Sequence, residues 1–293
     1  MNINWYPGHM AKTKKQILED LKLIDVVVEI LDARIPLSSQ NPDIGQFIKD
    51  KKRIVILNKS DLANETKNRK WVEYFEKKGI PAVLVDSNTG KGITEAIKKI
   101  EKVYQEREEK FSNQGRVGKS IRVMILGIPN VGKSSFINRV TKKNSAQVGN
   151  RPGVTRQKQW VRINENIELL DTPGVLWPKF ESEEIGLKLA YTGTIKDDVI
   201  ETIEIGFSLL KYLIKEYKSN LIERYKLETE KIEEILNQPE EEKEENDKVI
   251  EIMEEVGKKR GAIISGGRVD LEKVAKIILD DFRSGKLGRI TLD

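Results

Sequence analysis

The stretch "GIPNVGKS" at residues 127–134 constrains the fold of this chain more than any other feature. It directly follows the apolar run "IRVMIL" and precedes the amphipathic run "SSFINRVTKK". The spacing G-x-x-x-x-G-K-S between a strand and a helix is that of a phosphate-binding loop. Gly127 and Gly132 allow the backbone to curl, so that successive N–H groups face phosphates. Lys133 then places its charge at the β- and γ-phosphates, and the Ser134 hydroxyl can bind Mg²⁺. The predicted nucleotide contacts from this segment are Asn130, Val131, Gly132, Lys133, Ser134 and Ser135.

Short apolar runs alternate with helical patterns through the first half of the chain. The runs are rich in β-branched residues and almost continuously apolar, which is typical of strands buried on both faces of a parallel sheet. They cover residues 25–33, 53–61, 81–87, 121–127 and 167–174. Helical patterns at 66–78 and 92–109 lie between them, so the sequence predicts a three-layer α/β domain with a mostly parallel sheet.

The pattern changes after about residue 180, where no convincing buried strand follows. Helical periods predict a second, all-helical domain, and we place the two domains at residues 1–178 and 179–293. Four of its expected core positions are Ile203, Phe207, Leu210 and Ile214. The last two helices are expected near 247–259 and 270–283. Gly266 and Gly267 suit a turn with positive φ between them, and Asp270 can cap the final helix.

Two further motifs at strand ends predict recognition of a guanine base. The first is "NKSD", Asn58 to Asp61, in which the Asp61 carboxylate can accept hydrogen bonds from both N1–H and the exocyclic amine of guanine. Adenine offers no such pair of donors. Asn58 can bridge the base and the phosphate-binding loop, and the aliphatic stem of Lys59 can lie along the base plane. The second motif is "DSN", with contacts expected from Asp86, Ser87 and Asn88; Ser60 completes the predicted set.

"DTPG" at residues 171–174 supplies the parts expected around a metal-bound γ-phosphate. Asp171 is predicted to act in the Mg²⁺ shell, and the Gly174 N–H to contact the γ-phosphate. Thr155, in the polar loop "RPGVTRQ", is the candidate threonine that closes over Mg²⁺ and the phosphate. The predicted Mg²⁺ set is Ser134, Thr155 and Asp171.

Composition excludes several classes of site. The chain of 293 residues has no cysteine, so it has neither disulfides nor thiolate metal sites. No apolar run is long enough to cross a membrane and the first residues lack the apolar core of a signal peptide, so we expect a soluble cytoplasmic protein.

The charge of the chain is unevenly distributed. Residues 228–255 hold 13 acidic residues and three lysines, whereas the whole chain has a net charge of +5, so the remainder has a net charge of +15. That excess fits either an ordinary charged surface or a face for nucleic acid.

The motifs occur in an unusual order. In the Ras-like arrangement the phosphate-binding loop comes first and N-K-x-D late, whereas here NKSD and DSN precede the loop and DTPG comes last. A circular permutation accounts for this order, because the termini of a compact α/β domain lie near each other and rejoining them preserves the sheet.

The chain resembles the ribosome biogenesis GTPase A (YlqF) family, which consists of circularly permuted, TRAFAC-class bacterial GTPases. The resemblance lies in the motifs above and in "WYPGHMAKT", "DARIPLSSQNP", "RPGVTR" and "DLEKVAKIILDDFRSGKLGRI". The resemblance covers nearly the whole chain. It implies a monomeric GTPase that binds the immature large ribosomal subunit through rRNA, with ribosomal proteins as further partners. Its hydrolysis of GTP would be stimulated by the particle and act as a late assembly switch.

The resemblance also assigns roles to two residues. Ras-type enzymes orient the attacking water with a glutamine just after D-x-x-G, where this chain has Val175. The family is similar in having a hydrophobic residue there and in an N-terminal P-G-H histidine implicated in catalysis, which is His9, the single histidine of the chain. Asn130 matches an asparagine that binds K⁺ in related potassium-activated GTPases; alternatively, it only braces the loop.

Basic segments at residues 12–15 and 257–261 are candidate contacts with the rRNA backbone, on the N-terminal helix and the helical domain respectively. Arg283 and Arg289 are further candidates, and Phe282 fits an RNA contact less well than a core position. Two alternatives to the assembly switch remain: an RNA-binding module that uses GTP with negligible hydrolysis, and a GTPase that signals to a protein partner.

Overall fold

The computed structural model describes residues 9–48, 51–111, 120–144, 160–170, 182–195, 201–239 and 241–293. It divides into two compact units. The sheet unit contains the described residues up to Leu170 together with Thr291–Asp293, and the helical unit runs from Ser182 to Ile290. The two units are described separately below.

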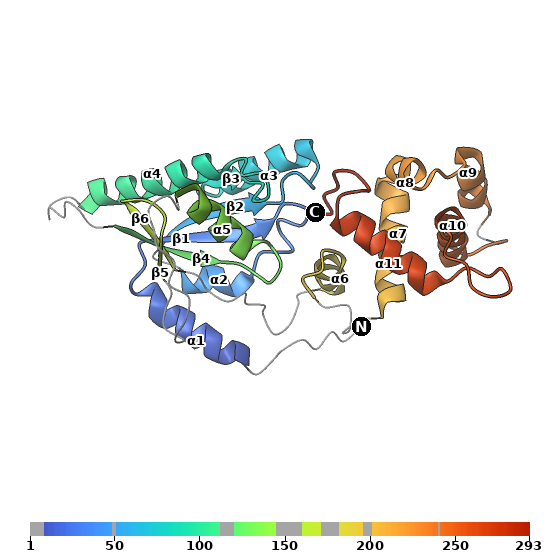
Figure 1. Ribbon diagram of the computed structural model, residues 1–293, viewed down its shortest axis with the longest axis horizontal. Coiled ribbons are helices and arrows are strands. Elements are labelled where there is room, and N and C mark those ends of the chain that lie inside the picture. Colours follow the sequence, from blue (N-terminus) through green and yellow to red (C-terminus); the bar gives the residue numbers. More distant parts are fainter. Residues whose placement is uncertain are drawn as a thin grey trace. The chain divides into compact units, whose positions relative to one another are not determined.

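Within the described residues, the sheet unit is built on six strands (Figure 1). They are β1 (Val26–Asp32), β2 (Lys52–Asn58), β3 (Ala82–Leu84), β4 (Ile121–Leu126), β5 (Trp160–Arg162) and β6 (Ile167–Leu170). Their spatial order is β3-β2-β1-β4-β6-β5, and every pair is parallel except the antiparallel β5–β6 pair. The predicted mostly parallel α/β sheet is therefore confirmed.

Helices cover both faces of this sheet. Every residue of β1 is buried although successive side chains point to opposite faces, which requires a layer on each side. The helices are α1 (His9–Leu21), α2 (Pro42–Phe47), α3 (Glu65–Lys77), α4 (Ile93–Phe111) and α5 (Lys133–Asn144). Ile17 and Leu21 of α1 pack in one cluster with Val27 and Met124 of the sheet, which leaves the side chain of Lys15 exposed.

Two short elements of this unit were not predicted. Helix α2 has only six residues and includes Gly45, and β5 has only three residues at the antiparallel edge of the sheet. Neither segment is long enough for its apolar residues to show the 3.6-residue period of a helix or the two-residue period of a strand. Helix α2 therefore depends on packing, and β5 on its pairing with β6.

All named elements of the described helical unit are helices, as predicted. They are α6 (Glu183–Tyr191), α7 (Thr202–Glu216), α8 (Lys218–Tyr225), α9 (Thr229–Asn237), α10 (Glu245–Arg260) and α11 (Leu271–Arg283). Helices α7 and α11 approach so closely that a Cβ on Gly206 would lie 2.5 Å from the Cβ of Ala275. Glycine is therefore required at this crossing.

The close crossing also shifts the buried stripe of α7 from its predicted position. Ile203 is 40% exposed and Phe207 and Ile214 are only half-buried, whereas Leu210 lies in the core as expected. The residues that are buried are Ile205, Gly206, Leu209, Leu210 and Leu213. Because the helix is apolar over most of its surface, its contact with α11 selects the core face.

The turn before α11 agrees with its prediction. Gly266 and Gly267 have φ of 82° and 75°, and the Asp270 side chain accepts a hydrogen bond from the Lys273 backbone N–H at 3.0 Å. This N-cap satisfies one of the donors that the first turn of α11 leaves free.

The last three residues of the chain pack on the sheet unit. The Leu292 N–H donates to the Arg34 carbonyl at 2.7 Å, and Thr291 Oγ1 accepts from the Asn64 N–H at 3.0 Å. The Asp293 carboxylate accepts from the backbone N–H groups of Leu37 and Ser38 at 2.8 and 2.9 Å. This segment therefore joins the loop after β1 to the start of α3.

We expect Leu292→Ala to lower the free energy of unfolding of the sheet unit by about 2–4 kcal/mol, because the side chain is only 4% exposed. Urea denaturation followed by tryptophan fluorescence measures this, since all four tryptophans lie at or before residue 177. Leu37→Ala is the control. Leu37 is 49% exposed and its N–H contact with Asp293 survives the change, so its effect should stay within about 0.5 kcal/mol. Equal effects of the two changes would contradict the structural role of Leu292.

No helix within the described residues is long and apolar enough to span a membrane.

Candidate nucleotide-binding site

The predicted motifs meet at the carboxyl edge of the parallel sheet. NKSD begins at the end of β2, DSN follows β3, and the phosphate-binding loop (residues 127–134) follows β4. The chain proceeds from β1 through β2 to β3 on one side, and β4 lies on the other side of β1. Open α/β sheets bind ligands at such a switch point, outside the carboxyl ends of the strands.

The phosphate-binding loop requires glycine at two positions. A Cβ on Gly127 would lie 2.6 Å from the Ile30 carbonyl oxygen, and one on Gly132 would lie 2.3 Å from Asn58 Nδ2. Gly132 also has φ of 95°, in a region that favours glycine. Helix α5 begins directly afterwards at Lys133, so the positive end of its dipole faces the loop.

Lys133 lies folded into this loop. Its side chain is buried, and Nζ donates to the carbonyl oxygens of Gly127 and Ile128 at 3.1 and 2.8 Å. Ser134 and Ser135, in the first turn of α5, are exposed. The loop thus combines a fixed ammonium group with available hydroxyl groups at a helix N-terminus.

Asn58 joins three motifs through one side-chain amide. Its Nδ2 donates to the Val131 carbonyl of the phosphate-binding loop at 2.8 Å. Its Oδ1 accepts from the N–H and the hydroxyl of Ser87 at 3.2 and 2.8 Å. The predicted bridge from NKSD to the loop is present, and the same residue also holds DSN.

Lys59 makes a second link between NKSD and the loop. It has φ of 58°, an uncommon value for a residue other than glycine. Its Nζ donates to the Asn130 carbonyl at 2.7 Å and lies 3.0 Å from the Asp32 carboxylate. Asn130 also has positive φ, 63°, and is exposed.

The remaining residues of NKSD and DSN are of two kinds: some have exposed side chains, and others form hydrogen bonds that shape the turns. Asp61 and Asn88 are exposed, and Ser60 is buried with its N–H donating to the Val85 carbonyl at 3.1 Å. The Asp86 carboxylate accepts from the backbone N–H of Asn88 at 2.8 Å, so it shapes the turn that presents Ser87.

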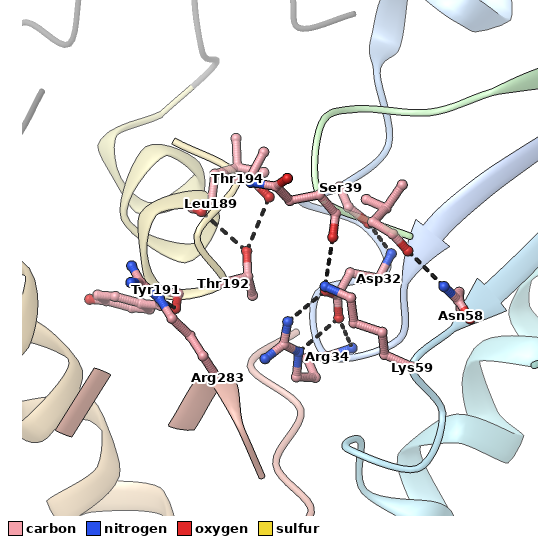
Figure 2. A network of polar contacts seen from close by, with 12 residues as sticks. Asp32, Arg34, Ser39, Asn58, Lys59, Leu189, Tyr191, Thr192, Thr194 and Arg283 are labelled. Carbon is pink, nitrogen blue, oxygen red and sulfur yellow. Dashed lines mark hydrogen bonds and ion pairs between the residues drawn. The ribbon is translucent and has the colours of Figure 1, made fainter. Parts of the chain in front are cut away.

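Sequence reasoning missed the residues that surround the end of β1. Asp32 and Arg34 form a bidentate pair, with Arg34 Nε and Nη2 lying 2.9 and 2.7 Å from the two carboxylate oxygens (Figure 2). The Asp32 N–H donates to Ser39 Oγ at 3.1 Å. One sequence feature indicates them: in "DARIP" an aspartate ends a buried strand and an arginine follows two residues later. This strand ends at the same sheet edge as the strands that carry the functional motifs.

Several predicted site residues lie outside the described residues: Thr155, Asp171, Gly174 and the side chain of His9, whose backbone opens α1. The pairing of β6 with β4 nevertheless matters for Mg²⁺. Leu170, the last residue of β6, is in register with Met124, so β6 ends at the same sheet edge as β4. Hydroxyl and carboxylate oxygens are the ligands that Mg²⁺ accepts, so the donor set of Ser134 with the predicted partners suits this ion.

In the helical unit, Phe282 occupies the core position that its sequence pattern favours, whereas Arg283, a predicted candidate for an RNA contact, is engaged within the unit. Phe282 is 2% exposed and belongs to the core face of α11. Arg283 donates through Nε and Nη2 to the carbonyl oxygens of Tyr191 and Ala190 at 3.0 and 2.8 Å, at the end of α6 (Figure 2). Its charge complements the carbonyl end of that helix. Among the described residues of the whole chain, no cluster of three or more His, Asp or Glu side chains could hold a metal ion.

Comparisons with known proteins agree with this geometry. The model of a family described as "50S ribosome-binding GTPase" matches residues 122–259. The chain is similar to ribosome biogenesis GTPase A of Bacillus cereus, with 43% identity over 100% of this chain and 94% of the relative. Ribosome biogenesis GTPase A of Bacillus licheniformis is also 43% identical, over 100% of this chain and 98% of the relative. A crystal structure of GNP-bound YlqF from T. maritima aligns with a TM-score of 0.64 and 26% identity, over 96% of this chain and 97% of that one. With such identity over its whole length, the chain belongs to the ribosome biogenesis GTPase A family of circularly permuted GTPases.

Proposed function

We propose that this GTPase binds GTP at the carboxyl edge of its sheet and uses hydrolysis as a late switch in assembly of the large ribosomal subunit. The observation that carries the nucleotide site is the Asn58 amide, which connects the phosphate-binding loop with both base-reading motifs. The relatives that support the ribosomal role are named as ribosome biogenesis GTPases, and the matching family is described as binding the 50S ribosome.

Each part of the site has a role in this proposal. Asp61 and the Ser87 backbone read the guanine base, Lys59 supports its plane, and Lys133 with the α5 N-terminus binds phosphates. Ser134, with Thr155 and Asp171, would hold Mg²⁺, which would supply positive charge to offset that of the β- and γ-phosphates. K⁺ beside Asn130 would add a fixed positive charge near the same phosphates.

His9 is proposed as the catalytic residue that orients water, since Val175 stands where Ras-type enzymes have glutamine. An imidazole can also accept a proton near neutral pH. Positioning is the more important role, because phosphoryl transfer needs little base catalysis.

The partner in this proposal is the precursor of the large subunit, contacted through rRNA by the N-terminal helix and the helical unit, with ribosomal proteins beside it. A cytoplasmic location and a monomeric state accompany such a role. Lys15 on α1 is exposed, as is Arg268 in the turn before α11. The charges of Lys258 and Lys259 are balanced by Glu255 and Glu228, so they contribute less to a basic surface than their number suggests.

We expect large subunits to stimulate GTP hydrolysis by the wild-type protein, and His9→Ala to lower the stimulated rate about 100-fold without weakening GTP binding. Release of phosphate with and without purified subunits measures the first effect, and calorimetry with GTP the second. His9→Gln is the matched variant and should retain more of the stimulated rate than His9→Ala, because its amide can hold a water. Replacing K⁺ by Na⁺ in the same assay tests the monovalent cation.

Three outcomes would contradict parts of the proposal. A lack of stimulation would favour an RNA-binding module with negligible hydrolysis. An unchanged rate in His9→Ala would exclude the catalytic role of His9. Co-sedimentation with subunits should weaken steeply with rising salt, because contacts with rRNA phosphates release counterions; independence from salt would favour a protein partner.

A further inference from the structure

A buried carboxylate ends strand β1, next to NKSD but outside it. Asp32 is 1% exposed, and β1 pairs with β2 so that Asp32 is in register with Asn58, the residue before Lys59. A charged side chain at such depth is costly unless every oxygen is satisfied, so its partners indicate its role.

Both oxygens of Asp32 have partners. One accepts from the backbone N–H and from Nε of Arg34, at 3.0 and 2.9 Å. The other accepts from Arg34 Nη2 at 2.7 Å and lies 3.0 Å from Lys59 Nζ. Arg34 is itself only 2% exposed, and the Asp32 N–H is held by Ser39. Arg34 therefore holds the carboxylate through both of its oxygens, and one of these oxygens also faces Lys59 (Figure 2).

The charge on Asp32 is stable at neutral pH. Burial raises the pKa of this carboxyl group, but the positive charges of Arg34 and Lys59 outweigh burial and hold the pKa well below its usual range. At neutral pH Lys59 therefore faces an ionised partner.

Lys59 needs an anchor, because its backbone is in the left-handed region at φ 58°. Residues with a Cβ persist there only when surrounding contacts hold them. The side chain has two contacts at its tip, the Asp32 carboxylate and the Asn130 carbonyl of the phosphate-binding loop. These two contacts fix the ammonium group of Lys59 between the end of β1 and the phosphate-binding loop.

We infer that Asp32 is a positioning residue for guanine-nucleotide binding, which acts by fixing the ammonium group of Lys59 so that the stem of Lys59 supports the base. Arg34 orients the carboxylate for this task. The inference rests on the proposed nucleotide site, and it adds a residue outside the motifs that contact the nucleotide.

The test is the affinity for GDP measured by calorimetry, in Asp32→Asn, in Lys59→Met and in the double variant. Asp32→Asn keeps the shape of the side chain but removes its charge, and we expect about 10- to 100-fold weaker binding. Lys59→Met keeps most of the stem and loses the ammonium group. If Asp32 acts through Lys59, adding Asp32→Asn to Lys59→Met weakens binding little further. With GTP as substrate the loss should appear in KM, since Lys59 supports the base in the ground state and the transition state alike.

Glu29→Gln is the matched control. Glu29 lies three residues earlier in β1, is fully buried, and pairs with Arg53 rather than with any residue of the site. The Glu29→Gln variant should lower the urea concentration at the midpoint of unfolding and leave the affinity for GDP unchanged. A purely structural role of Asp32 predicts the same behaviour in Asp32→Asn.

Asp32→Asn leaves Arg34 buried without its counter-ion and could therefore fail to fold. The variant Asp32→Asn/Arg34→Gln removes the deeply buried charge of Arg34 together with that of Asp32 and leaves only the partly exposed ammonium of Lys59, so it should fold and show the same loss of affinity. Wild-type affinity in either variant, or full additivity with Lys59→Met, would overturn the inference. Absence of GDP binding by the wild-type protein would instead overturn the proposed site.

Discussion

Asp61→Asn is expected to exchange the base specificity of the protein from guanine to xanthine. In the proposed site the Asp61 carboxylate accepts from N1–H and the exocyclic amine of guanine, whereas an asparagine amide can donate to the oxygen that xanthine carries at the position of that amine. Losing a charge-assisted contact should weaken GTP binding by about 100- to 1000-fold, and XTP should bind better than GTP. Calorimetric titration with both nucleotides measures the exchange.

The control for this change is Glu65→Gln, in the first turn of α3. Glu65 is exposed and pairs with Arg69 on its own helix, so the variant changes the local charge as Asp61→Asn does. It should bind GTP like the wild-type protein. Retention of a preference for GTP in Asp61→Asn would mean that the base is not read by NKSD.

Gly132→Ala should have the second large effect, because the new methyl group would meet Asn58 Nδ2 at 2.3 Å. Either the phosphate-binding loop or Asn58 must move, which breaks the contact with the Val131 carbonyl. We expect GTP binding to weaken by about 100-fold or more and the free energy of unfolding to fall by about 1–3 kcal/mol, since φ of 95° is also strained for alanine. Calorimetry and urea denaturation measure the two effects.

Gly79→Ala separates backbone strain from the clash. Gly79 follows α3 with φ of 71°, and a Cβ there would meet nothing within 4 Å. This variant should lose about 1 kcal/mol of stability and keep its affinity for GTP. If Gly132→Ala lost stability alone, without affinity, the role assigned to the loop would be wrong.

Much of the site could be predicted because its chemistry is carried by short motifs. The glycines of the phosphate-binding loop, the amide of Asn58 and the position of NKSD follow from local spacing at strand ends. Parallel strands bring their carboxyl ends to one edge, so Asn58 and Val131, 73 residues apart in the chain, come together in a way that can be predicted without knowledge of side-chain packing.

The missed features are contacts between segments that no local pattern connects. Asp32 reaches Lys59 because β1 pairs with β2 in one register, and Leu292 reaches Arg34 across more than 250 residues. In α7 the predicted core position Ile203 is exposed, since the fit of Gly206 against Ala275 selects another face. Arg283 donates to carbonyl oxygens at the end of α6, and its sequence surroundings do not distinguish an arginine that caps a helix from one exposed to a partner.

The amino-acid sequence alone therefore specifies the strand–loop–helix units, the residues proposed to recognise phosphate and guanine, and their permuted order, because these depend on backbone freedom and functional groups within a few residues. Tertiary structure alone decides which buried charges are paired, which face of a helix is core, and where the last residues bind. Those outcomes depend on desolvation and close packing between distant segments, and the free energy of a buried group is set by its partners.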